Sequence, residues 1–470
     1  MPKQIRLNAF DMNCVGHQSP GLWTHPDDRA DSYNTLEYWT DLARTLERGK
    51  FDALFLADVL GIYDVYKGSA DTALANAVQV PVNDPLMVVP PMAMVTEHLG
   101  FGITCALSYE LPYPFARRMS TLDHLTKGRV GWNVVTSYLP NAARNFGHED
   151  EVEHDHRYEI ADEYLDVVYK LWEGSWDDDA VIVDRDNRVY ADPAKVRYIN
   201  HAGPYYRVAG PHLSEPSPQR TPVIYQAGVS DAGRSFAGRH AEAIFMGGSS
   251  IAQVRTFVED VRRVAASEGR NPSDIKFLPG ANIIVGRNDE EVAKKVDEYR
   301  RLRSVEGYLA HANSAVDWTR HDRSALVGDL IDLKDTNRNR SARNYRPDQT
   351  VGELLDNLGA ISRPFTVAGT PKVVVDEMER WIREGGVDGF NLIQQLTPGT
   401  ARDFIELVIP ELRKRGLFRQ SYTDGETLRE RYLGPGQARL PGAHPGARFR
   451  DPAALRPPSP VTPVASHARA

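Results

Sequence analysis

The chain has 470 residues, of which 41% are hydrophobic, 26% charged and 9% aromatic. Such a composition supports a large globular core, and the length permits one large domain because α/β barrels run well past the average domain size. The net charge of −8 argues against a nucleic-acid partner, since proteins that bind by neutralising phosphates carry a basic excess.

The sequence offers no sign of a membrane or secreted protein. The longest strongly apolar run, residues 86–95, contains two prolines and is shorter than the roughly 20 residues that a bilayer requires. The first residues include no apolar stretch typical of a secretory signal. The two cysteines, Cys14 and Cys105, lie far apart and outside any CxxC pair, which excludes a disulfide framework. We therefore expect a cytoplasmic protein.

Short apolar runs alternate with helical patterns along most of the chain. Strands are predicted at residues 5–10, 52–57, 101–106, 130–135, 222–226, 243–246, 276–285 and 389–393. Helices are predicted at residues 36–48, 85–98, 114–125, 157–172, from 231, 251–266, 289–303 and 401–413. Eight strands, each followed by a helix, predict an α/β fold of the (β/α)8 TIM-barrel class.

The predicted barrel domain spans residues 1–432 and carries two insertions. Residues 177–207 are rich in charges, Asn, Gly and Pro, which favours an inserted hairpin. Residues 304–369 form a long polar excursion, and loops of that length are usually functional lids or disordered. Residues 433–470 are rich in Pro, Gly, Ala and Arg with almost no aliphatic pattern, so we expect this tail to be disordered or to lie over a neighbour.

The active site of such a barrel lies at the carboxyl ends of its strands. The sequence contains neither a GxGxxG dinucleotide motif nor a GxxxxGK[ST] phosphate loop, and GxSxG and HExxH are also absent. A phosphate site is plausible after the fifth strand, where Ala227, Gly228 and Ser230 lead into a helix. Small residues there allow close backbone approach, Ser230 is a good N-cap, and free N–H groups attract phosphate. A plain helix cap without a ligand is the alternative.

Residues 148–156 are dense in His, Asp and Glu, which raises the possibility of a metal site. His154 and His156 are two residues apart, however, so they do not share a helix face. Acidic residues just before a helix favour its positive end. We therefore expect a charged helix entry and no metal, with a metal-dependent barrel hydrolase built on these two histidines as an alternative. Asp58 ends an apolar strand at the barrel mouth, where a carboxylate needs a partner.

Several long motifs point to a known family. They lie at residues 51–58, 120–129, 131–137, 153–155 with 157–158, and 226–228 with Ser230. Together they resemble the flavin-dependent monooxygenases of the bacterial luciferase family, in the subgroup of nitrilotriacetate and dibenzothiophene-sulfone monooxygenases. Residues 8–10, 12–17, 61–66 and 82–87 are most similar to the long-chain alkane monooxygenases of that subgroup. The resemblance covers residues 5 to about 432 and leaves out the tail.

The resemblance implies a barrel that binds FMN non-covalently and inserts oxygen with FMNH2 supplied by a separate flavin reductase. It implies that FMN contacts Asp58, Ser137, Tyr138, His154, Tyr158, Ala227, Gly228 and Ser230, with Tyr158 and Ser230 at the phosphate. It implies a reaction chamber lined by Cys14, His17, Tyr63, Gln79 and His311. At position 138 the alkane monooxygenases carry His. The tyrosine here is bulkier and titrates at about pH 10 rather than about 6.5, which bears on the substrate and on any proton relay.

We therefore expect an FMNH2- and O2-dependent monooxygenase that acts on an apolar substrate, with long-chain alkane hydroxylation as the leading activity. Oxidative cleavage of a C–S or C–N bond in a sulfone or amine is the alternative within the same chemistry. A flavin- or deazaflavin-dependent dehydrogenase, or a flavin-binding protein, is a further alternative. We also expect a homodimer or homotetramer. Apolar walls are predicted from Val59, Leu60, Ile62, Val65, Val78 and Val80, with Lys67 as the nearby cation; packing of a lid is the other interpretation of these residues.

Overall fold

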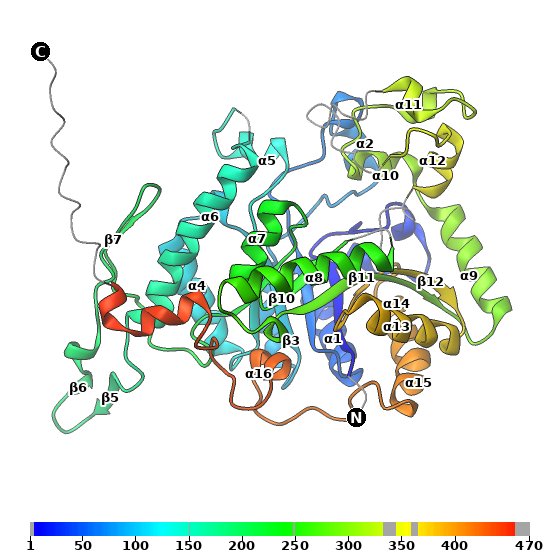
Figure 1. Ribbon diagram of the computed structural model, residues 1–470. Helices are drawn as coiled ribbons and strands as arrows, with labels where there is room; N and C mark the ends of the chain where they lie inside the picture. Colours follow the sequence, from blue (N-terminus) through cyan, green and yellow to red (C-terminus); the bar gives the residue numbers. More distant parts are fainter. Residues whose placement is uncertain (1–3, 150, 248–249, 332–344, 359–364, 456–470) are drawn as a thin grey trace, which may run out of the picture.

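Eight parallel strands close into a barrel in the computed structural model, which describes residues 4–149, 151–247, 250–331, 345–358 and 365–455 (Figure 1). Each strand pairs with the next around the ring, and the last pairs with the first. In ring order the strands are β1 (Arg6–Met12), β2 (Ala53–Ala57), β3 (Gly100–Ala106), β4 (Val130–Val135), β9 (Val223–Gln226), β10 (Ala243–Met246), β11 (Lys276–Val285) and β13 (Gly389–Ile393). The predicted barrel and its eight strands are confirmed.

Helices follow the strands and cover the outside of the barrel. They are α1 (Leu36–Arg48), α3 (Val89–Met94), α4 (Pro112–Leu125), α6 (His154–Tyr169), α7 (Asp231–His240), α8 (Ile251–Ser267), α9 (Asp289–Leu302), α13 (Pro371–Gly385), α14 (Gly399–Asp403) and α15 (Ile409–Lys414). The helix predicted at 85–98 is instead a 3-10 turn, Pro85–Val88, followed by the short α3. Pro90 and Pro91 explain the break, because proline is tolerated only in the first turn of a helix.

Aromatic side chains fill the barrel. Phe10, Phe55 and Tyr225 point inward from three strands and are buried together. Gly131 on β4 makes room for one of these rings, since an added Cβ would lie 2.4 Å from Cε2 of Tyr225. The core is therefore built from large rings set against small strand residues, which is why the strands read as continuous apolar runs.

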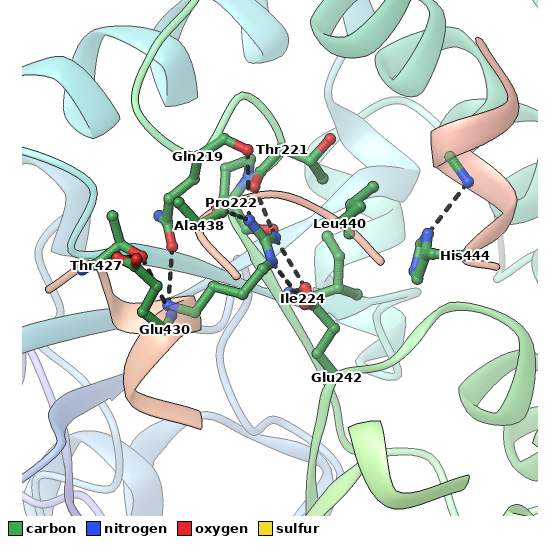
Figure 2. Close-up of polar contacts among 12 residues, drawn as sticks. Gln219, Thr221, Pro222, Ile224, Glu242, Thr427, Glu430, Ala438, Leu440 and His444 are labelled. Atoms are coloured by element: carbon green, nitrogen blue, oxygen red, sulfur yellow. Dashed lines mark hydrogen bonds and ion pairs between the residues drawn. The ribbon is translucent and has the colours of Figure 1, made fainter. Parts of the chain in front are cut away.

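The short helix α16 (Leu428–Leu433) closes the amino end of the barrel. The hydroxyl of Tyr432 donates to Oδ1 of Asn8 at 3.1 Å and lies 2.8 Å from the hydroxyl of Tyr225 inside the barrel. Arg429, on the same helix, is fully buried, and its Nε lies 2.6 Å from Oε1 of Glu242. Figure 2 shows Glu242, Thr221 and Pro222 gathered around this buried cluster of polar contacts.

A helical cap sits above the carboxyl ends of the strands. It comprises α2 (Asp71–Ala75), α10 (Val305–His311), α11 (Val327–Leu330) and α12 (Val351–Asn357), which lie together at the top of Figure 1. The cap has its own apolar cluster, which includes Tyr63, Val78, Leu309 and Trp318. Much of the predicted excursion at 304–369 is thus packed over the barrel mouth, while residues 332–344 and 359–364 lie outside the described residues.

One strand was missed by the sequence analysis. β12 (Phe365–Gly369) pairs in parallel with the second half of β11, outside the ring of eight. β11 is ten residues long, so it can pair with β10 through Lys276–Pro279 and with β12 through Ala281–Val285. The five residues of β12 alternate between inward and exposed positions, but a strand this short that ends in Ala and Gly gives little periodic signal.

Antiparallel strands lie in the segment 177–207, where the sequence favours an inserted hairpin. β5 (Val181–Asp184) pairs with β6 (Val189–Ala191), and a second pair joins β7 (His201–Ala202) to β8 (Arg207–Val208). The second pair extends one residue beyond the predicted boundary. No helix within the described ranges is long and apolar enough to cross a membrane.

The sequence predicts that residues 433–470 are disordered or lie over a neighbour, and disorder is contradicted for residues 434–455. Residues 434–455, here called the C-terminal arm, pack against the barrel and bury Leu440, His444, Phe449 and Leu455. The arm is held by scattered anchors, such as the ion pair of Arg439 with Asp178 at 2.6 Å, rather than by a repeating apolar face. Periodicity therefore carries no signal for it. Residues 456–470 lie outside the described residues.

Candidate active site

A cleft of about 1110 Å³ opens at the carboxyl ends of β2, β4 and β9. It runs between the loops after these strands and the first turns of α6 and α7. Val134 and Ala106 form part of its apolar wall. All eight residues predicted to contact FMN line this cleft, namely Asp58, Ser137, Tyr138, His154, Tyr158, Ala227, Gly228 and Ser230. The fold thus brings together residues that are up to 172 positions apart, from Asp58 to Ser230.

The start of α7 forms one end of the cleft. Ser230 is the N-cap, and its Oγ accepts a hydrogen bond from the backbone N–H of Gly233 at 3.1 Å. Tyr158 of α6 stands opposite, and burial raises the pKa of its hydroxyl while a hydrogen bond with Ser230 opposes that rise. A Cβ added at Gly228 would lie 2.5 Å from Oη of Tyr158, so the glycine leaves a cradle beside this hydroxyl. Nε2 of His154 lies 3.4 Å from Oγ of Ser230.

The acidic run before α6 serves as the helix entry. Glu153 is the N-cap, and its carboxylate accepts hydrogen bonds from the backbone N–H groups of Asp155 and His156. Nδ1 of His154 lies 2.7 Å from Asp155, whereas Nδ1 of His156 lies 2.8 Å from Glu159, so the two histidines engage different carboxylates. Within the described residues, no group of three or more His, Cys, Asp or Glu side chains is arranged to hold a metal ion.

An arginine that the sequence analysis did not assign supports the loop after β4. Arg157 is buried, and its Nη1 donates to the carbonyl of Ser137 at 2.8 Å and lies 3.2 Å from Oε2 of Glu151. Ser137 has a φ of 61°, a left-handed conformation that is uncommon for a residue with a side chain. The buried arginine therefore stabilises a strained turn that lines the cleft. Its only sequence signal is its place in the motif at residues 157–158.

Asp58 lies across the cleft from α7, at the end of β2. Burial raises the pKa of its carboxyl to about 7, with a further contribution from the negative charge of Asp84. Gln226, at the end of β9, is buried beneath the cleft, and its Oε1 has no hydrogen-bond partner among the described residues. Both groups remain able to bond with a polar ligand.

The five predicted chamber residues lie beneath the helical cap, and four of them form one hydrogen-bonded network. The hydroxyl of Tyr63 donates to Oε1 of Gln79 at 2.9 Å. Nε2 of Gln79 donates to the carbonyl of His17 at 3.0 Å and lies 3.0 Å from Nε2 of His311. Cys14 is buried nearby, and burial raises the pKa of its thiol, so it is a neutral, weakly polar side chain rather than a thiolate.

Tyr138 joins the cleft to this network. Its ring is nearly half exposed, and its hydroxyl lies 2.5 Å from that of Tyr63. Polar contacts therefore run without a gap from the cleft through Tyr138, Tyr63 and Gln79 to His311. Such a chain can orient a substrate and hold the tyrosine hydroxyls in fixed directions at the edge of the cleft.

The sequence left two roles open for the apolar residues after β2, as walls of the substrate site or as packing of a lid, and the structure places residues in both positions. Val59 and Leu60 line the cleft. Ile62 and Val80 pack against the cap cluster, and Val78 is part of its core. Nζ of Lys67 lies 2.6 Å from Glu306 and 3.8 Å from Asp317, so this cation is already paired with carboxylates.

Comparison with known proteins identifies the family to which the chain belongs. The family model of luciferase-like monooxygenases matches residues 10–389. The long-chain alkane monooxygenase of Geobacillus thermodenitrificans is 53% identical, over 96% of this chain and 99% of the relative. The dimethyl-sulfide monooxygenase of Hyphomicrobium sulfonivorans is 48% identical, over 96% of this chain and 95% of the relative.

Solved structures of related enzymes match the fold of this chain. The crystal structure of long-chain alkane monooxygenase matches with a TM-score of 0.88 at 52% identity, covering 96% of this chain and all of that one. A riboflavin lyase crystallised with modified FMN and riboflavin matches with a TM-score of 0.87 at 37% identity, covering 95% of this chain and all of that one. The barrel, the cleft at its mouth and these relatives together show that the chain belongs to the luciferase-like monooxygenase family.

Proposed function

We propose that this protein is the oxygenase of a two-component system, which takes FMNH2 from a separate flavin reductase and inserts one atom of O2 into an apolar substrate. The observation that carries the proposal is the cleft in which all eight expected flavin contacts meet. The relative named component A of nitrilotriacetate monooxygenase supports the division of labour with a reductase. Alkane hydroxylation is the leading activity.

The residues of the cleft fit a flavin mononucleotide. The cradle at Gly228, between Tyr158 and the first turn of α7, offers hydroxyl and backbone N–H donors suited to a phosphate. The apolar wall at Val134 suits a flat ring, and Gln226 and Asp58 offer polar atoms to its edge. When bound, reduced flavin supplies the electrons that reduce O2, one oxygen atom going to the substrate and the other to water. The helical cap over the mouth would keep bulk water away.

The charges around the site support the proposal of an apolar substrate. Among the described residues that line the cleft, the only Lys or Arg is Arg157, and it is already bonded to Glu151 and Ser137. Lys67 is paired with carboxylates of the cap. A site for an aminocarboxylate should instead present a cation for its carboxylates.

A small organic sulfide is the second candidate substrate. The relative that acts on dimethyl sulfide is 48% identical to this chain. Tyr138 also departs from the histidine expected in alkane monooxygenases. Its ring is bulkier than that of histidine and contacts Tyr63 at the edge of the cleft, which would favour a short substrate over a long chain.

Turnover with a flavin reductase, NADH and FMN will test the function and choose the substrate. We expect oxidation of hexadecane to an alcohol, or of dimethyl sulfide by C–S cleavage, and no oxidation of nitrilotriacetate. Tyr138→His, with Tyr138→Phe as its matched control, should shift the ratio of kcat/KM values toward hexadecane if the tyrosine limits chain length. Product masses and NADH consumption give the readout. Oxidation of nitrilotriacetate alone would show that the pocket is polar.

Asp58 should make flavin binding depend on pH. The pKa of its carboxyl, raised to about 7 by burial, places its ionisation in the working range. A bound flavin removes more water and carries a negative phosphate, and both effects favour the protonated acid. FMN affinity should therefore fall as pH rises through about 7, because binding then requires uptake of a proton. Fluorescence titrations across this range will check it, with Asp58→Asn losing the dependence. A dependence that persists in Asp58→Asn would assign it to another group.

A further inference from the structure

The C-terminal arm packs along the side of α6, the helix that carries Tyr158. Nη2 of Arg448 lies 2.9 and 3.0 Å from the two carboxylate oxygens of Asp166. Gly446 sits directly on the ring of Tyr169, since an added Cβ would lie 2.8 Å from ring carbons. Figure 1 shows this red segment beside α6. The arm is therefore part of the support of the cleft, although it lies outside it.

His444 connects the arm to α7, the helix whose first turn forms the phosphate end of the cleft. Its Nε2 lies 2.9 Å from the carbonyl oxygen of His240, the last residue of α7, and its Nδ1 lies 3.1 Å from the backbone N of Gly446. A carbonyl can only accept and an amide N–H can only donate, so His444 is neutral with its proton on Nε2. Figure 2 shows this side chain on the arm, well apart from Glu242. His444 thus satisfies a carbonyl that the helix itself leaves free.

The same end of α7 is also bound to α6. Nε2 of His240 lies 2.9 Å from Oδ1 of Asp162, and its Nδ1 lies 3.3 Å from the hydroxyl of Tyr169. Arg270 donates to the carbonyls of Gly238 and Ala241 at 2.9 and 2.8 Å. The position of α7 relative to α6 is therefore fixed at its carboxyl end by buried polar contacts, among which His444 is the contribution of the arm.

The opposite end of α7 tolerates little movement. The helix has ten residues and is about 15 Å long. At its start, an added Cβ at Gly228 or Gly233 would lie 2.5 or 2.9 Å from Oη of Tyr158. Since packed helices move as rigid units, a shift at the carboxyl end changes the spacing between Ser230 and Tyr158.

We propose that the C-terminal arm, acting through His444, positions α7 against α6 and so sets the phosphate end of the flavin site. His444 is a positioning residue, because it is buried at the far end of α7 and does not line the cleft. The inference rests on the proposed flavin site. It predicts that His444 affects the binding of FMN but not of riboflavin, which lacks the phosphate.

The test compares the affinities of the purified full-length chain for FMN and riboflavin. His444→Leu removes the donor and fills much of the volume, whereas His444→Gln retains an amide donor. Arg439→Ala, which removes only the contact of the arm with Asp178, is the control. We expect His444→Leu to weaken FMN binding about fivefold, the effect of one hydrogen bond, while riboflavin binding stays the same. His444→Gln should restore FMN affinity, and Arg439→Ala should leave both affinities unchanged.

A measurement on the unaltered protein covers the case in which His444→Leu does not fold. Coupling between two sites is reciprocal, so saturating FMN should slow amide hydrogen exchange at Gly446, and saturating riboflavin should not. Equal losses for both flavins in His444→Leu, or exchange at Gly446 that does not respond to FMN, would overturn the role of the arm. An unaltered protein that binds riboflavin as tightly as FMN would instead refute the phosphate site of the proposed function.

Discussion

Gly228→Ala should abolish most flavin binding. The added Cβ would lie 2.3 Å from Nε2 of Gln226 and 2.5 Å from Oη of Tyr158, and carbon atoms do not approach that closely without displacing a neighbour. Both neighbours line the cleft, so moving either one damages the site. Overpacking and the loss of a phosphate contact together should weaken FMN binding on the order of a hundredfold.

Isothermal titration with FMN, beside thermal unfolding, will measure this effect. Gly442→Ala is the matched control, because nothing lies within 4 Å of the Cβ that it would add. The control should bind FMN like the unaltered protein. Gly228→Ala should unfold slightly below the control, since Gln226 is buried and overpacking lowers stability, but it should remain folded. Normal FMN affinity in Gly228→Ala would mean that the phosphate lies elsewhere.

Arg429→Met should cause the largest loss of stability. Its guanidinium lies 2.6 and 2.9 Å from the carboxylate oxygens of Glu242 and donates to the carbonyls of Thr221 and Pro222. Methionine leaves the carboxylate of Glu242 buried without its counter-ion. Breaking a buried pair in this way lowers the free energy of unfolding by about 3–5 kcal/mol.

Urea unfolding followed by circular dichroism will measure the loss. Arg255→Met is the control, because Arg255 forms an exposed pair with Glu259, and exposed pairs contribute little to stability. The double variant Arg429→Met with Glu242→Gln should recover part of the stability, since no charge is then left buried. If Arg429→Met is as stable as Arg255→Met, the ion pair that joins α16 to Glu242 contributes little to the free energy of unfolding.

The barrel itself could be predicted because its strands obey a simple pattern. Parallel strands covered on both faces read as unbroken apolar runs, and all eight were placed within a few residues. The start of a helix could also be predicted where the sequence offers a clear N-cap residue, such as Ser230 before α7. The helix predicted at 85–98 was too long, because a pattern of apolar residues does not register the N–H groups that Pro90 and Pro91 lack.

The site was predictable only in part. Motif resemblance named the residues of the cleft, but the chain of contacts from Tyr138 to His311 depends on how the cap packs over the barrel. Arg157 was not assigned because its hydrogen bond to the carbonyl of Ser137 depends on the tertiary structure and leaves no pattern in the sequence. The C-terminal arm was missed because its anchors, including His444, are individual polar contacts without a period.

The central claim is that a flavin phosphate binds between Ser230 and Tyr158, and FMN titration of Ser230→Ala and Tyr158→Phe tests it most directly. Each variant removes one hydroxyl beside the cradle. A charge-assisted hydrogen bond to phosphate contributes about 1.5–3 kcal/mol, so each variant should bind FMN roughly 10- to 100-fold more weakly, with riboflavin affinity little changed. Unaltered FMN affinity in both variants would contradict the account.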